Sequence, residues 1–184
     1  TSGIQKLREA LAQPKSSVRI VGLSGVGKTR LVQALFDKAI GSDALDPRLA
    51  VYTDLSDSPD PTPLELLEQL QNFCQRCVLI VDNCGAAIHR KLCARMRNAV
   101  SDVSLVTVEY DVSDDEQENT ETFRLEPASA RIIRRIVERR YPDLAQPDVS
   151  TIVSFSEGNA RIALALAQEA QRGDSVANLK DSDL

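Results

Sequence analysis

Long hydrophobic runs are absent from this sequence. Its longest strongly apolar stretches, such as Cys77 to Val81, are far shorter than the roughly 20 residues needed to cross a bilayer. No secretory signal precedes Ile4, so the sequence predicts a cytoplasmic protein with no membrane partner. An initiating Met is also lacking, and the opening Thr1-Ser2-Gly3 favours a piece of a larger protein.

Glycine and proline are scarce as well, at eight residues each, while 42% of the residues are hydrophobic and 27% are charged. This balance predicts a chain that folds over most of its length. At 184 residues the chain can bury one main core with a small appendage, but not two full domains. The net charge of -5 disfavours a general nucleic-acid binder, because phosphate backbones require a concentrated positive surface. A local basic patch is still compatible with that charge.

Cysteine and histidine offer few metal ligands. The four cysteines are Cys74, Cys77, Cys84 and Cys93, and the Cys74-x-x-Cys77 spacing is compatible with zinc or redox chemistry. If Cys77 opens a strand and Cys84 follows its end, however, the two lie roughly 23 Å apart at about 3.3 Å per residue, too far for one tetrahedral metal. Ordinary reduced cysteines are therefore the favoured interpretation. The single histidine, His89, is expected to have no catalytic role.

Strand-like apolar runs alternate with segments of helical period over the first two thirds of the chain. The predicted strands cover residues 18–23, 49–55, 77–82, 103–109 and 122–125, and the predicted helices cover 4–13, 28–40, 63–74 and 86–100. This alternation predicts an α/β fold with a parallel five-stranded sheet and helices on both of its faces.

After Pro127 the pattern becomes purely helical, over residues 129–140, 148–155 and 159–171. We therefore predict a core at residues 1–126 and a small, partial helical lid at residues 127–184. The polar, acidic stretch at 111–119 predicts an exposed loop.

The segment Gly22-Leu23-Ser24-Gly25-Val26-Gly27-Lys28-Thr29 fits the P-loop pattern G-x-x-x-x-G-K-[ST] between a predicted strand and helix. Glycines let the backbone wind closely around phosphates, whose charge meets N–H groups at the start of the helix. Lys28 is expected to reach the β- and γ-phosphates, and Thr29 to coordinate Mg²⁺. The sequence thus predicts ATP or ADP with Mg²⁺, held by Gly22, Ser24, Gly25, Val26, Gly27, Lys28, Thr29 and Arg30.

A second part of the site is predicted where the apolar run from Val78 closes on Asp82. This aspartate is placed to hold Mg²⁺, although Asp82-Asn83-Cys84-Gly85 is also good turn chemistry. The predicted catalytic set is Lys28, Asp82 and Asn83. Because the amide of Asn83 cannot act as a base, hydrolysis should be slow or should use a base from elsewhere. Asp54 is one candidate for that base, and an ordinary loop acid is the simpler interpretation.

Two groups of arginines leave alternatives open. Arg161 follows Asn159 at the start of a predicted helix, so it either faces solvent or contacts the γ-phosphate. Arg131, Arg135 and Arg139 repeat every four residues, which favours a solvated or partner-facing stripe over a nucleic-acid patch.

The order of these features, ending in Gly158-Asn159-Ala160-Arg161, resembles the AAA+ ATPases and their relatives, the STAND signalling ATPases of the NACHT and NB-ARC type. The resemblance implies that Arg161 is the nucleotide-sensing arginine of the lid, and that Thr107 or Glu109 is the polar sensor on the fourth strand. Asn83 stands where AAA+ motors usually have Glu. The acidic stretch occupies the place of their arginine finger, and both departures favour the STAND side.

The implied function is an ATP/ADP switch with weak ATPase activity, in which ATP exposes an oligomerising surface and further domains of the same chain are partners. The rival interpretation is an AAA+ loader or remodeler acting on nucleic acid, with ring assembly and robust turnover. A P-loop phosphotransferase is disfavoured because no arginine-rich lid is visible, and a GTPase because no [NT]-K-x-D motif occurs.

Overall fold

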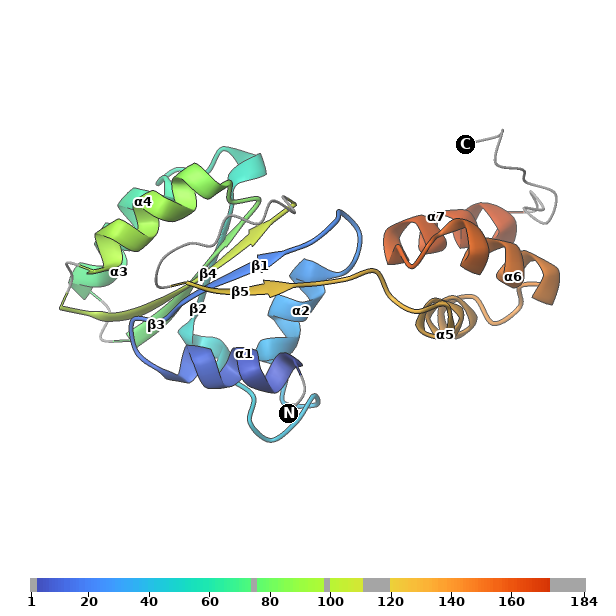
Figure 1. The fold of residues 1–184 in the computed structure, drawn as a ribbon, viewed down its shortest axis with the longest axis horizontal. Coiled ribbons are helices and arrows are strands. Elements are labelled where there is room, and N and C mark those ends of the chain that lie inside the picture. The colour runs from blue at the N-terminus through green and yellow to red at the C-terminus, as the bar shows by residue number, and fades with distance from the viewer. Residues whose placement is uncertain (1–2, 74–75, 98–99, 111–119, 173–184) are drawn as a thin grey trace. The chain divides into compact units, whose positions relative to one another are not determined.

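The chain forms two compact units. The computed structural model describes residues 3–73, 76–97, 100–110 and 120–172. One unit, called the sheet unit below, comprises Thr1–Gly22 and Lys28–Arg124, and the other, the helical unit, comprises Leu23–Gly27 and Leu125–Leu184 (Figure 1). The acidic stretch predicted to be an exposed loop, at 111–119, lies outside the described residues.

A five-stranded parallel sheet forms the centre of the sheet unit, as predicted. Its order is β2-β3-β4-β1-β5, with β1 at Ser17–Val21, β2 at Ala50–Asp54, β3 at Arg76–Asp82, β4 at Asp102–Glu109 and β5 at Glu121–Arg124. Val21 pairs with Glu109, and Thr107 pairs with Val81. The carboxyl ends of β1, β4 and β3 therefore lie next to one another.

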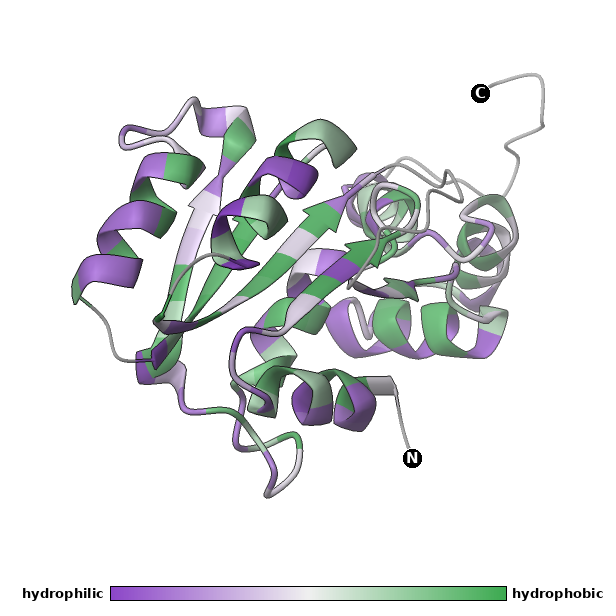
Figure 2. Cartoon of the chain, turned by 60° about the vertical axis from the view of Figure 1, so that its left-hand side comes forward, coloured by the Kyte–Doolittle hydropathy of each residue, from purple (hydrophilic) through white to green (hydrophobic). Residues whose placement is uncertain are grey.

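Helices cover both faces of this sheet (Figure 1). Helices α1 (Gly3–Ala12) and α2 (Lys28–Leu35) pack on one face, and α3 (Pro63–Phe73) and α4 (Ala86–Arg97) on the other. Two short 3₁₀ helices, η1 (Pro47–Leu49) and η2 (Leu55–Asp57), flank β2. Apolar residues run without interruption from Cys77 to Val81 in β3, and every residue of β3 after the first is buried (Figure 2). In β4 all residues from Val103 to Val108 are buried, although Ser104 and Thr107 are polar. Such runs, buried on both faces, are typical of parallel sheets.

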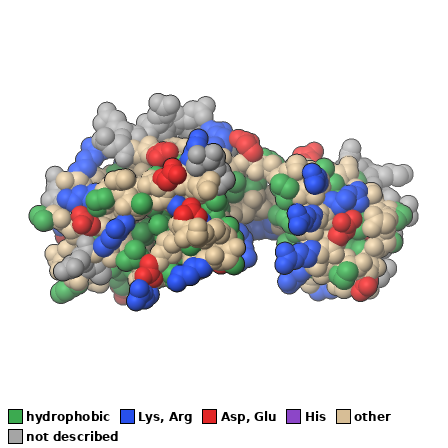
Figure 3. Space-filling view, turned by 90° about the horizontal axis from the view of Figure 1, so that it is seen from below, with side chains coloured by type: hydrophobic (Ala, Val, Ile, Leu, Met, Phe, Trp, Pro, Cys, Tyr) green, Lys and Arg blue, Asp and Glu red, His purple; other side chains and the backbone are tan. Residues whose placement is uncertain are grey.

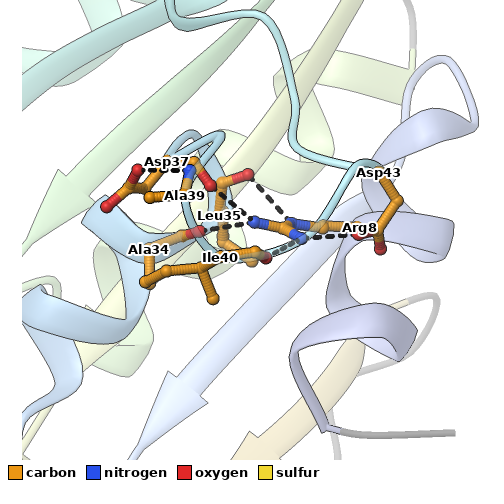
Figure 4. A network of polar contacts seen from close by, with 7 residues as sticks. All are labelled: Arg8, Ala34, Leu35, Asp37, Ala39, Ile40 and Asp43. Atoms are coloured by element: carbon orange, nitrogen blue, oxygen red, sulfur yellow. Dashed lines mark hydrogen bonds and ion pairs between the residues drawn. The ribbon is translucent and has the colours of Figure 1, made fainter.

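Helix α2 ends at Leu35, so the prediction that it continues to Ile40 is wrong. The cause is Arg8 of α1, whose side chain is only 3% exposed. Its Nε donates to Leu35 O at 3.0 Å, Nη1 to Ile40 O at 2.7 Å, and Nη2 to Ala34 O at 2.7 Å (Figure 4). The guanidinium thus adds donors to carbonyl groups at the end of the helix, where i→i−4 partners run out, and Leu35 O also accepts from Leu45 N at 3.0 Å. Nη1 also forms an ion pair with Asp43.

Three helices form the helical unit, as predicted: α5 (Ala130–Arg140), α6 (Gln146–Phe155) and α7 (Ala160–Gln171). The side chain of Asn159 caps α7 by accepting hydrogen bonds from the N–H groups of Arg161 and Ile162. The core of this unit is small and aliphatic, built from Ile133, Val137, Val149, Ile152, Ala163 and Ala167. Among the described residues, no helix combines the length and hydrophobicity required to span a membrane.

Candidate nucleotide-binding site

The backbone of the predicted P-loop has the conformation that glycine permits. Gly25 and Gly27 have φ values of +84° and +103°, a region that residues with a Cβ rarely adopt. Gly27 has no heavy atom within 4 Å of an added Cβ, so backbone conformation and not space requires glycine there. The predicted glycine-rich turn therefore precedes α2, which begins at Lys28.

Lys28 and Thr29 occupy the first turn of α2. Lys28 Nζ donates a hydrogen bond to Gly22 O at 2.8 Å, and Thr29 Oγ1 donates to Asp82 Oδ2 at 2.9 Å. The N-terminus of a helix presents unpaired N–H groups and a partial positive charge, which favours a phosphate there. The structure thus joins Thr29 and Asp82, which lie 53 residues apart in sequence.

Asp82 is held by three donors and is only 6% exposed. Besides Thr29, Tyr52 OH donates to its Oδ2 at 3.0 Å, and Asn83 N donates to its Oδ1 at 2.9 Å. Burial and this bond to a carboxylate raise the pKa of Tyr52. Tyr52 was not among the predicted site residues. Its role depends on the register of β2 against β3, which pairs Tyr52 with Ile80, and sequence does not reveal that register.

The pair formed by Thr29 and Asp82 fits a magnesium ion. A hydroxyl and a carboxylate are oxygen ligands of the kind that Mg²⁺ prefers, and this ion usually takes its other ligands from water and substrate phosphates. Within the described parts of the chain, no group of three or more His, Cys, Asp or Glu residues could hold a metal without such help. A Mg²⁺ ion here would therefore depend on a bound phosphate.

Asn83 and Asp54 are paired with each other. Asn83 has a φ of +53°, and its Nδ2 donates to Asp54 Oδ1 at 2.7 Å. Asp54 Oδ1 also accepts from Ser56 N and Ser56 Oγ. Burial by itself would raise the pKa of Asp54, but these hydrogen bonds outweigh it and hold that pKa below its usual value. Asp54 is therefore a poor general base, which weakens the hypothesis that it supplies the base that Asn83 cannot provide.

The two candidates for the sensor on β4 differ in their surroundings. Thr107 is fully buried, and its hydroxyl is hydrogen-bonded to His89 Nδ1 at 2.8 Å. His89 Nε2 lies 3.1 Å from Thr120 Oγ1, and burial, with the charges of Arg19 and Arg90, lowers the pKa of His89 to about 4. The hydroxyl of Thr107 is thus already hydrogen-bonded to a side chain of α4. Glu109 lies at the end of β4, half-buried.

The helical unit brings together Arg161 and part of the P-loop. Asn159 Nδ2 donates to Ser24 O at 2.8 Å, and Arg161 Nη1 donates to Ser24 Oγ at 3.3 Å. A side chain on Gly25 would clash with Asn159 and Arg161. Arg161 also lines an open pocket of about 800 Å³ between α5 and α7, together with Arg139 and Arg140. In Figure 3, Lys and Arg side chains gather on this unit, at the right of the view.

For several other residues named from the sequence, the structure gives the exposure or local contacts, and their roles stay predictions. Arg30 is exposed, and its Nη1 donates to Gln33 Oε1 at 2.7 Å. Val26 is half-buried. Cys77, Cys84 and Cys93 are free and buried, while Cys74 lies outside the described residues. Burial raises the pKa of the Cys84 thiol to about 12, which keeps that sulfur protonated.

A scan against protein-family models finds no match to this chain, and a search of curated protein sequences finds none either. Solved structures do resemble it. Drosophila ORC bound to DNA matches with a TM-score of 0.65 and 15% identity over 96% of this chain and 57% of that chain. AMPPCP-bound DnaA from Aquifex aeolicus matches with a TM-score of 0.60 and 15% identity over 98% of this chain and 62% of that chain. The chain spans less than two thirds of either protein, and its fold is that of the AAA+ ATPase domains of ORC and DnaA.

Proposed function

We propose that this chain is the Mg·ATP-binding module of a larger STAND-type signalling or regulatory ATPase, working as an ATP/ADP switch with slow hydrolysis. The observation that carries the proposal is the hydrogen bond from Thr29 Oγ1 to Asp82 Oδ2, directly beside Lys28 at the start of α2. These residues combine an anion-binding helix terminus with two oxygen ligands suited to Mg²⁺.

Each residue of this set has a distinct task in nucleotide binding. Lys28, now hydrogen-bonded to Gly22 O, would turn its ammonium group to the β- and γ-phosphates. Thr29 and Asp82 would hold Mg²⁺, which neutralises phosphate charge when bound. Tyr52 OH and Asn83 N keep the carboxylate of Asp82 in a fixed orientation.

The slow hydrolysis in this proposal follows from the residues beside Asp82. The side chain of Asn83 is bound to Asp54 and carries no basic group. Asp54 accepts hydrogen bonds from Asn83 and Ser56, which stabilise its ionised form and make it a weak proton acceptor. We therefore expect turnover well below the roughly 1–10³ s⁻¹ of typical enzymes.

Arg161 is the proposed reporter of the nucleotide state. Its bond to Ser24 Oγ places a guanidinium against the segment that phosphates would contact, and guanidinium pairs strongly with phosphate. A difference between its contacts with ATP and with ADP would shift the population of two conformations. The partners of the switch would be further domains of the same chain and, in the ATP state, other copies of it.

An AAA+ loader acting on nucleic acid is the second candidate. Two observations favour it: one solved structure of this fold is an ORC complex bound to DNA, and Arg131, Arg135 and Arg139 are exposed on α5. This function requires nucleotide-dependent ring assembly and turnover in the ordinary enzymatic range. Phosphate release in the ordinary enzymatic range, abolished by Lys28→Ala, would favour the loader over the switch.

Titration calorimetry with Mg·ATP and Mg·ADP tests the proposed function. Lys28→Ala should weaken ATP binding by about 3 kcal/mol, or roughly 100-fold, because it removes a charge-assisted contact with phosphate. Lys38→Ala is the matched control, since Lys38 is an exposed lysine after the end of α2. Equal ATP affinity in Lys28→Ala and the unmodified chain would overturn the proposal.

A further inference from the structure

The turn that follows Asp82 contains no available carboxylate. Asn83 donates its amide hydrogen to Asp54 at 2.7 Å, so both side chains at this point are engaged with each other. Cys84 follows with a buried, protonated thiol, and its N–H donates to Val108 O at 2.8 Å. That bond fastens the turn to the end of β4.

Glu109 brings a carboxylate to this turn from the neighbouring strand. It is the last residue of β4, and the register pairs it with Val21, the residue before the first P-loop glycine. A Cβ built on Gly85 would lie 3.5 Å from Glu109 Oε2. The carboxylate therefore lies against the segment directly after Asp82 and at the edge of the sheet where β1 ends.

One oxygen of this carboxylate is buried without a hydrogen bond. Tyr110 N donates to Oε1 at 2.9 Å, whereas no described residue donates to Oε2. Buried polar atoms without partners are rare in proteins, and a catalytic role is one of the reasons they persist. A carboxylate oxygen with a free lone pair is the group that a water molecule can bind and lose a proton to.

Arg19 provides the balancing charge. It lies on β1 and pairs with Thr107, two residues before Glu109, so its side chain belongs to the same face of the sheet as Glu109. Arg19 is 3% exposed, and its Nε and Nη1 also have no hydrogen-bond partner. No ion pair within 4.0 Å joins Arg19 to Glu109 among the described residues, so the carboxylate is not locked by a direct bond.

We propose that Glu109, which comes from β4 and not from the turn after Asp82, is the general base of the slow ATP hydrolysis in the proposed function, on which this inference rests. A water held by Glu109 Oε2 attacks the γ-phosphorus as the carboxylate accepts its proton. The bond from that phosphorus to the bridging β–γ oxygen breaks, and its electron pair leaves with ADP. The proton then passes to the released phosphate or to solvent, which regenerates the carboxylate.

Single-turnover hydrolysis and analogue binding test Glu109 on the whole chain. With Glu109→Gln, the rate of ATP cleavage should fall at least about 100-fold, the usual contribution of a general base. The affinity for the non-hydrolysable analogue AMPPCP should change less than about 3-fold, because the base acts in the transition state. Asp102→Asn is the matched control, since it alters an exposed carboxylate at the opposite end of β4, and its rate should stay within about 3-fold.

The alternative role for Glu109 is only to balance the charge of Arg19. In that case Glu109→Asp, which keeps the charge but withdraws the carboxylate by one methylene group, would retain both thermal stability and hydrolysis. As a general base, Glu109 cannot be replaced this way, so Glu109→Asp should stay folded and lose most of the rate. If Glu109→Gln fails to fold, Glu109→Asp still tests the role of the carboxylate.

The outcomes separate the inference from the proposed function. Hydrolysis at the unmodified rate in Glu109→Gln or Glu109→Asp would overturn the inference, and so would an unmodified chain that binds AMPPCP but cleaves no ATP. Failure of the unmodified chain to bind AMPPCP would instead remove the proposed function itself.

Discussion

Arginine is used differently in the two units of this protein. In the sheet unit Arg8 and Arg19 are each 3% exposed. The guanidinium of Arg8 donates to several backbone carbonyls around the end of α2. In the helical unit Arg131, Arg135 and Arg139 are exposed and have no carboxylate partner within the described residues. A buried charge is costly wherever polar groups around it do not compensate, whereas an exposed charge costs little and stays available to a ligand.

This contrast teaches where substitutions should act. Changes of the buried arginines Arg8 and Arg19 should lower the stability of the sheet unit. Changes in the helical unit should alter binding and leave stability nearly unchanged. The predictions below test this division, beginning with the largest expected effect.

Arg8→Met should lower the free energy of unfolding by about 2–4 kcal/mol, because the buried or partly buried carbonyls of Ala34, Leu35 and Ile40 would each lose a charge-assisted hydrogen bond. Urea unfolding followed by circular dichroism measures this. Asp43→Asn is the control, and it should cost less than about 1 kcal/mol because Asp43 is largely exposed. A loss as small for Arg8→Met as for Asp43→Asn would show that the network is not a stabilising one.

His89 should make the sheet unit sensitive to acid. Burial first, and then Arg19 and Arg90, lower its folded pKa to about 4 from 6.5. Between these values the unfolded chain binds more protons, so stability is lost as the pH falls from about 6.5 to about 4. The expected loss is on the order of 2–3 kcal/mol.

The variant His89→Gln isolates this effect, because it removes the titrating ring while the carboxylates of the chain remain. Urea midpoints of both proteins are measured from pH 7 to pH 4. The difference in slope between them reports His89. Parallel pH profiles would mean that the imidazole titrates in the folded protein as it does in the unfolded chain.

The two units also show why some features could be predicted from the sequence and others could not. The P-loop turn and Asp82 have local signals: glycines that permit positive φ, and an acid that closes an apolar run. The parallel order of the strands followed from their alternation with helices. In these cases the residue type and its immediate sequence neighbours are enough for the prediction.

Tyr52 and the end of α2 depend on contacts between distant segments. The helical period after Leu31 and the stop at Gly41 favoured a helix to Ile40, but Arg8 binds the carbonyls there and tertiary contact outweighs propensity. A faint signal existed, because Arg8 stands four residues after Ile4 and three before Leu11, within the apolar stripe of α1. Likewise, the pairing of Asn83 with Asp54 could not be read from residues 29 positions apart.

Arg161→Ala tests the helical unit by a functional effect. It should change the stability of the fold by less than about 0.5 kcal/mol, as is usual for an exposed side chain. The affinity for ATP relative to ADP should shift by about 1–3 kcal/mol if Arg161 senses the γ-phosphate. Calorimetry with both nucleotides measures the shift, and Arg172→Ala at the end of the same helix is the control. An unchanged affinity ratio in Arg161→Ala would reduce Arg161 to a solvated residue.

The smallest effect, and the only stabilising one, is expected from Arg135→Glu on α5. Arg131, Arg135 and Arg139 are spaced by four residues, so Arg135 is repelled by a like charge on each side. The substitution makes two repulsive pairs attractive and makes one attractive pair, with Glu138 three residues on, repulsive. The net change should raise the free energy of unfolding by roughly 0.5–1 kcal/mol. Arg135→Gln is the matched control, because it removes the two repulsive pairs and the attraction to Glu138 without adding new pairs, and its gain should be about half as large. Urea unfolding in low salt measures both, and added salt should shrink the gain since exposed charges are screened. A loss of stability in Arg135→Glu would mean that this arginine is engaged in the folded protein, and the contrast between the two units would then fail at its clearest example.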